Sequence, residues 1–195
     1  MAYCSPCPSG NITGYTVDAC DLKSSLMKSG ISRLLLLKCA EVLTDVTSTV
    51  EWTALVSGAD AEVTPQGKAA FPEPTYELVE IDACGTKVNI DGKVEVEFST
   101  FLLDPTADGH NTFINDYNEL AQSYTILFLG CDNRMYYSYA WATGTNPGFG
   151  INNGYAFLKD DGKLKTMTIK AELDVTSGLY KSFVLTAAMK TALGI

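Results

Sequence analysis

The sequence predicts a β-rich α+β fold: an antiparallel sandwich or barrel built of hairpins, with one flanking amphipathic helix. The strongest strand signal is Met167 to Val175, where apolar and polar residues alternate without a break. Asp161-Gly162 precedes this run and marks one hairpin turn, and Asp132-Asn133 marks another. The helix signal lies before both turns, where apolar residues recur at helical spacing from Phe113 to Tyr124.

The first elements are predicted from buried runs and capping residues. Asp21 can cap a short helix over 22–29. The apolar run 31–39 indicates a buried strand. Ser48 and Glu51 fit a capping box, in which Glu51 reaches back to the Ser48 amide, before a helix that Gly58 can end.

The middle of the chain is predicted to contain a loop over 59–75 and then a hairpin. Every second residue of 93–98 is apolar, which is typical of a strand with one wet face. A three-residue turn ending at Gly92 would pair Val88 with Val94 and keep one face apolar. We therefore expect these two strands to be hairpin partners.

The second half carries the remaining elements. A helix is expected to begin at Asn111 or Thr112. A central strand is predicted over 125–131, because that run is apolar on both faces. An aromatic strand over 135–141, a long Gly/Asn-rich loop over 143–154 and a C-terminal helix over 185–193 complete the prediction.

Length and composition limit the function. The 195 residues suit one domain over 21–195, preceded by an irregular arm over 1–20 that is rich in Cys, Pro and Gly. A formal charge of −9 argues against a basic nucleic-acid-binding surface, and a single histidine argues against histidine catalysis. The sequence shows no secretory signal and no membrane-spanning run, so we expect folding in a cytoplasm.

The six cysteines have three interpretations: free thiols, a late disulfide or a zinc site. Cys4 and Cys7 form one close pair, but no second close pair follows, which favours free thiols. His110 lies in a turn-rich segment and is expected to be a surface-loop histidine. We therefore expect no catalytic residues, no metal site and no cofactor.

Two groups of residues are candidate sites. Four carboxylates, Glu95 with Glu97 and Glu172 with Asp174, lie two apart on predicted strands and so share wet sheet faces. A catalytic pair is the less common reading of such spacing. Tyr136, Tyr137, Tyr139 and Trp141 form an aromatic segment, which is typical either of core packing or of an interface that stacks sugars or anchors a partner.

Four stretches across residues 31–141 share their order and character with a known family: 31–39, Leu43 to Val46 with Glu51-Trp52, Ile81-Asp-Ala-Cys-Gly85, and the run from Asn115 to Tyr136. They resemble virion structural proteins of tailed bacteriophages, and the nearest group is the crAss-like phages of Bacteroidetes. This resemblance implies a non-enzymatic, multi-copy component of the phage head or tail. The arm over 1–20 lies outside the match.

The resemblance leads to a specific expectation. The protein would self-assemble into a tail tube or a head-associated lattice in the host cytoplasm and remain in the virion. Its partners would be further copies and other virion proteins, with no membrane and no sequence-specific nucleic acid. An acidic tube lumen would let DNA pass without sticking, and the four carboxylates could line it. The alternative is a glycan-binding adhesin that uses residues 136–141.

Overall fold

The structure is a computed structural model in which seven segments are described. They are residues 30–72, 76–80, 87–91, 94–101, 108–160, 165–174 and 180–195. The arm predicted over 1–20 and the helix predicted over 22–29 lie outside these residues.

Eleven strands and three α-helices make up the described chain, so the predicted β-rich α+β class is confirmed. The strands are β1 (Ile31–Lys38), β2 (Ala61–Val63), β3 (Gly67–Lys68), β4 (Tyr76–Glu80), β5 (Lys87–Asp91), β6 (Val94–Phe101), β7 (Tyr124–Gly130), β8 (Arg134–Ser138), β9 (Phe149–Asp160), β10 (Lys165–Asp174) and β11 (Tyr180–Val184). The helices are α2 (Thr49–Ser57), α3 (Asp108–Leu120) and α4 (Ala187–Leu193).

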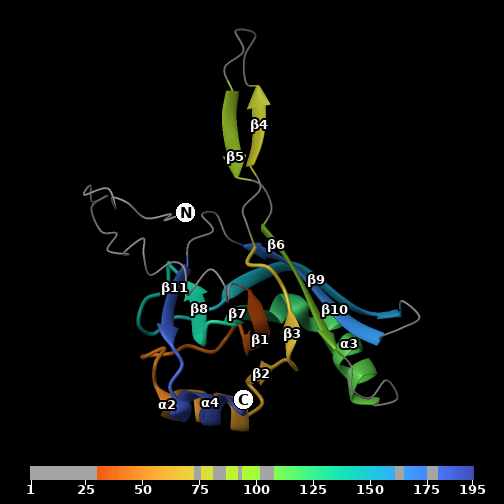
Figure 1. Cartoon of the computed structure of the whole chain (residues 1–195). Coiled ribbons are helices and arrows are strands. Elements are labelled where there is room, and N and C mark those ends of the chain that lie inside the picture. The colour runs from red at the N-terminus through yellow and green to blue at the C-terminus, as the bar shows by residue number, and fades with distance from the viewer. Residues whose placement is uncertain are drawn as a thin grey trace, which may run out of the picture.

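Nine strands form one antiparallel sheet that curls back on itself. Its main order is β11-β8-β7-β9-β10-β6-β3, and β1 pairs with both β7 and β2. The residue after β3, Ala69, forms a bridge with Ile31 at the start of β1. The path β1-β7-β9-β10-β6-β3 therefore returns to β1, which corresponds to the barrel alternative (Figure 1).

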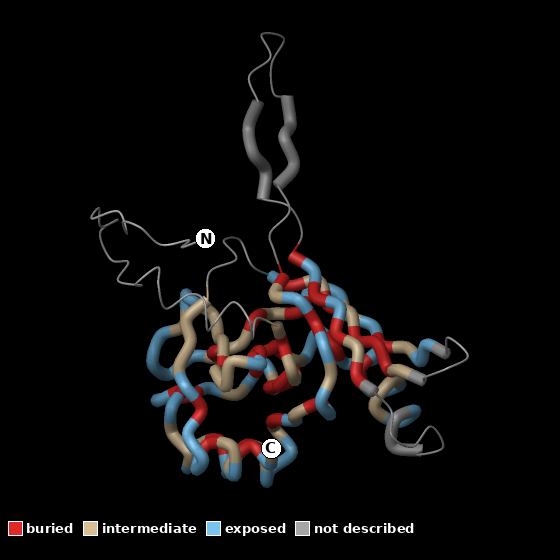
Figure 2. The backbone as a smooth tube through the Cα atoms, in the orientation of Figure 1, coloured by how far each residue is buried: buried red, intermediate tan, exposed pale blue. Residues whose placement is uncertain are grey.

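Two hydrophobic cores flank the central strands, and Figure 2 shows their buried residues within the main body. On β1, Leu34 and Leu36 face the core enclosed by the curled sheet, whereas Leu35 and Leu37 face the second core beneath α2 and α4. Strand β7 alternates in the same way. Both strands need apolar residues on both faces, which explains their unbroken apolar runs.

Helix α2 begins where it was predicted, but its cap differs from a capping box. The Ser48 hydroxyl accepts a hydrogen bond from the Glu51 amide, as expected. The Glu51 carboxylate instead accepts from the Thr44 amide and hydroxyl, while the Ser48 amide donates to the Asp45 carbonyl. The predicted return contact from Glu51 is therefore wrong, because the preceding turn already satisfies the Ser48 amide.

Helix α3 begins at Asp108, three residues before the predicted start, so His110 lies in a helix and not in a loop. The helix covers the edge of β9 beyond the point where β7 stops pairing with it. There the Asn118 side chain accepts from the Ala156 amide at 2.6 Å and donates to the Ala156 carbonyl at 3.2 Å. One side chain thus supplies both bonds that a neighbouring strand would make.

Three further predictions need correction. Strand β5 pairs with β4, so that Val88 lies opposite Val79, and Val94 of β6 lies opposite Leu173. The predicted pairing of Val88 with Val94 is wrong. The expected loop over 59–75 contains β2 and β3, and the expected loop over 143–154 ends where β9 begins at Phe149.

Candidate assembly surfaces

The outward face of β6 and β10 carries three of the four predicted carboxylates close together. Glu95 lies directly opposite Glu172, and Glu97 lies opposite Lys170. Val94, Val96 and Phe98 point the other way and are buried, because side chains alternate along a strand. The fourth carboxylate, Asp174, is exposed further along β10, where it lies opposite Gly150 of β9.

Among the described residues, the basic group in the hollow beside these carboxylates is Lys170. The Lys170 Nζ atom lies 2.7 Å from Glu97 Oε2, and this hydrogen bond raises the pKa of Lys170. Glu95 and Glu172 face each other as like charges, an arrangement that weakens a strand pair. Together with Asn153 and Tyr155 of β9, these residues line a hollow of about 300 Å³. The surface is therefore acidic and open to a cationic partner.

The aromatic segment does not form one surface. Tyr136 packs against Phe71, with ring centroids 4.6 Å apart, and its hydroxyl donates to the Asp132 carboxylate. Tyr137 and Trp141 contact each other edge to face and pack on the second core. Tyr139 is exposed, and Lys181 lies 5.1 Å from its ring centroid. Tyr136 and Tyr137 are successive residues of β8 and point to opposite faces, while Tyr139 and Trp141 follow the end of the strand at Ser138.

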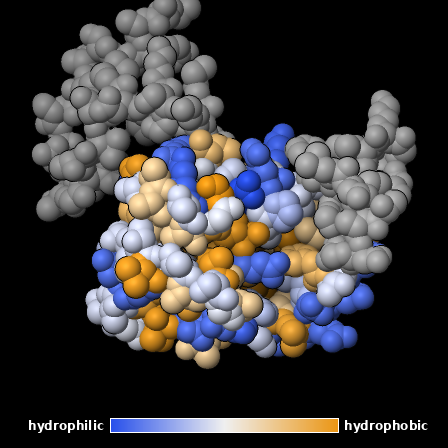
Figure 3. All heavy atoms as spheres, turned by 90° about the horizontal axis from the view of Figure 1, so that it is seen from below, coloured by the Kyte–Doolittle hydropathy of each residue, from blue (hydrophilic) through white to orange (hydrophobic). Residues whose placement is uncertain are grey.

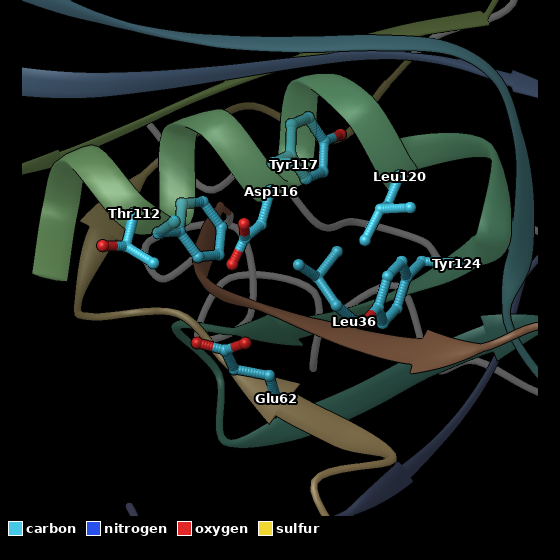
Figure 4. A pocket seen from close by; sticks show the side chains of 8 residues that line it. Leu36, Glu62, Thr112, Asp116, Tyr117, Leu120 and Tyr124 are labelled. Atoms are coloured by element: carbon cyan, nitrogen blue, oxygen red, sulfur yellow. The ribbon is translucent and has the colours of Figure 1, made fainter.

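A second hollow, which the sequence did not reveal, lies between α3 and the β1–β2 edge (Figure 4). Its volume is about 330 Å³, and Glu62 and Asp116 stand on opposite walls. Burial, and secondly the charge of Asp116, raise the pKa of Glu62. Glu62 lies in a segment predicted to be a loop, and Asp116 lies outside the apolar stripe of α3, so no local pattern connects them.

The described residues contain no group of three or more His, Cys, Asp or Glu side chains that could hold a metal ion. Cys39 and Cys131 are exposed free thiols. Burial raises the pKa of Cys39, whereas a nucleophilic cysteine needs a lowered pKa. Within the same described residues, no helix is both long and apolar enough to cross a membrane.

Similarity to known proteins is slight. No protein-family model and no curated protein match the chain. One solved structure that matches the chain is a protein of the sheath–tube complex of PVC, an extracellular contractile injection system. That complex was determined in its extended state by cryo-electron microscopy. The matched protein is 9% identical, the match covers 87% of this chain and 100% of that chain, and the TM-score is 0.35. A TM-score this low supports no conclusion about function.

Proposed function

We propose that this protein is a non-enzymatic structural subunit of a tailed-phage virion, which assembles in many copies into a tail tube or head-associated lattice. The observation that carries the proposal is the acidic face of β6 and β10, where Glu95, Glu97 and Glu172 lie around Lys170. This face has the charge sign that a DNA-conducting lumen needs. Further copies and other virion proteins would be its partners.

The shape of the fold is consistent with assembly. The strands at the ends of the described sheet, β2 and β11, offer backbone groups for pairing with another chain. The β4–β5 ribbon stands apart from the main sheet in Figure 1, where a neighbouring subunit could reach it. The end of the molecule with α2 and α4, seen from below in Figure 3, mixes hydrophobic and hydrophilic residues on its surface.

The glycan-binding alternative gains no support from this geometry. A sugar-stacking surface needs exposed rings on one face, and Tyr136, Tyr137 and Trp141 are packed against the two cores. Tyr139 is the exposed member of the segment.

Two measurements test the proposal. Negative-stain microscopy and light scattering over a range of concentrations should show rings, tubes or sheets. Assembled Glu95→Lys should retain DNA in a filter-binding assay at low salt, whereas Glu119→Lys, an equal charge change on the exposed side of α3, should not. A protein that stays monomeric with and without other particle components would refute the proposal. Equal DNA retention by both variants would refute the lumen assignment.

A further inference from the structure

The hollow beside α3 combines negative charge with apolar surface. Asp116 projects from α3 and Glu62 from β2, and the two carboxylates approach the same space (Figure 4). Desolvation raises the pKa of Glu62 most, and the charge of Asp116 across the hollow raises it further. Among the described residues, no basic group forms an ion pair with either carboxylate. A cation entering this space would relieve the repulsion.

The rest of the lining is apolar. Leu36 and Tyr124 form the strand side, and Leu120 forms the helix side, where its side chain is 47% exposed. A leucine left this exposed beside an aromatic ring favours an apolar side chain as a ligand. The hollow therefore has the chemistry to receive a segment in which a lysine or arginine adjoins a large apolar residue.

The chain itself carries such a segment at Leu158–Lys159. Leu158 is 44% exposed, and Lys159 is exposed and makes no ion pair within the described residues. Most other exposed or half-exposed cations of the described chain are already engaged: Lys38 with Asp60, Lys170 with Glu97, Lys181 with the ring of Tyr139, and Arg33 and Arg134 in hydrogen bonds. Lys190 is half-exposed and without an ion pair in the described chain, but it adjoins the buried Met189. Lys68 is exposed and without an ion pair in the described chain, but its neighbours are Gly67 and the buried Ala69.

The position of this segment suits an intermolecular contact. Leu158 and Lys159 lie near the end of the long β9–β10 hairpin, which extends beyond the main body (Figure 1). Side chains alternate along the strand, so a strand inserted between the helix wall and the strand wall contacts both. Lys159 can then meet Asp116 on the helix wall while Leu158 turns to the strand wall, where Leu36 and Tyr124 lie.

We propose that the Leu158–Lys159 segment of one copy docks into the α3 hollow of a second copy. This proposal rests on the proposed function, because it needs a chain that self-assembles. The contact joins two different surfaces, so it is heterologous and repeats from copy to copy. Such a contact produces a ring when its rotation closes and a helical array when it does not.

A charge exchange tests the docking. Lys159→Glu and Asp116→Lys should each weaken self-association at least about tenfold in sedimentation velocity, which corresponds to about 1.4 kcal/mol. Combining both substitutions recreates an opposite-charge pair and should restore most of the association. Lys68→Glu is the matched control and should associate like the wild type. Circular dichroism should show that all four variants keep the wild-type fold.

The outcomes separate the docking from the wider function. If the wild type assembles but Lys159→Glu and Asp116→Lys do so equally well, the docking is refuted and the assembly proposal stands. If both single variants weaken association and the double variant does not recover, the direct contact is refuted. If the wild type never associates, both proposals fail together.

Discussion

Asn118 offers a direct test of how α3 stabilises the sheet. Its side-chain oxygen accepts a hydrogen bond from the Ala156 amide at 2.6 Å, and its side-chain nitrogen donates one to the Ala156 carbonyl at 3.2 Å. Ala156 is 3% exposed. Asn118→Ala removes both bonds and leaves a donor and an acceptor on β9 without a protein partner. A hydrogen bond contributes about 1 kcal/mol net, so the expected loss is about 2 kcal/mol in the free energy of unfolding.

The measurement is urea unfolding followed by circular dichroism, with thermal unfolding as a second readout. For a chain of this size, a loss of about 2 kcal/mol lowers the Tm by about 4–8 °C. Gln122→Ala is the matched control, because Gln122 makes a single bond of 2.9 Å to the Asn152 carbonyl at an exposed position. We expect its loss to stay at or below about 1 kcal/mol.

A third variant separates the two bonds. Asn118→Asp keeps the acceptor for the Ala156 amide and removes the donor to the Ala156 carbonyl, so its stability should lie between those of the wild type and Asn118→Ala. If Asn118→Ala unfolds within about 0.5 kcal/mol of the wild type, α3 does not replace a strand at this edge. The same result would show that water satisfies Ala156 equally well.

Three further predictions follow from burial and charge. Leu127→Ala, at a fully buried side chain of β7, should cost about 3 kcal/mol in urea unfolding, whereas Val50→Ala, at 78% exposure on α2, should cost less than about 0.5 kcal/mol. Because the pKa of Glu62 is raised, its ionisation disfavours the folded state, so Glu62→Gln should have the higher Tm at about pH 8 and no advantage at about pH 4. Lys170→Met should leave the midpoint of urea unfolding nearly unchanged, since the pair with Glu97 is largely exposed to solvent, and a clear drop in the midpoint would show that the pair supports the sheet.

The sequence predicts those elements whose burial follows a short-range pattern. The alternation of β6 and β10 is visible because the core lies on one face of each strand. The run 31–39 and the run 125–131 are apolar throughout because the two cores enclose both faces of β1 and β7. In these cases the local sequence reflects the burial of each residue, so the predicted boundaries fall within two residues of the observed ones, except that β6 ends three residues later, at Phe101.

Pairing partners were harder to predict, because they depend on chain geometry far from each strand. Val88 and Val94 look like hairpin neighbours, and the rule that keeps apolar residues on one face favours that register. Strand β5 instead pairs with β4, and β6 pairs with β10. Both arrangements satisfy the same local pattern. The sequence around the turn therefore cannot choose between them.

The candidate site likewise combines features that follow from local spacing with features that depend on long-range strand pairing. The shared face of Glu95 and Glu97 follows from their spacing, but the position of Glu172 opposite Glu95 follows from strand register. The hollow with Glu62 and Asp116 could not be predicted at all, because it joins a three-residue strand to the polar side of a helix. Polar residues on short strands carry no periodic signal.

Under the proposed function, the acidic face would act only through repetition. Within one copy Lys170 offsets part of the charge of Glu97, and Glu95, Glu172 and Asp174 add to the negative charge of the face. At physiological ionic strength the charges of one subunit are screened over about 8 Å, and a single copy would deflect DNA weakly. In the proposed ring, copies would surround the DNA with the same face on every side. The distance from the DNA to the nearest acidic face would then be shorter, and salt would screen the repulsion less. The DNA-retention experiment must therefore be made on the assembled particle, and retention by the free Glu95→Lys monomer would indicate simple charge attraction without a lumen.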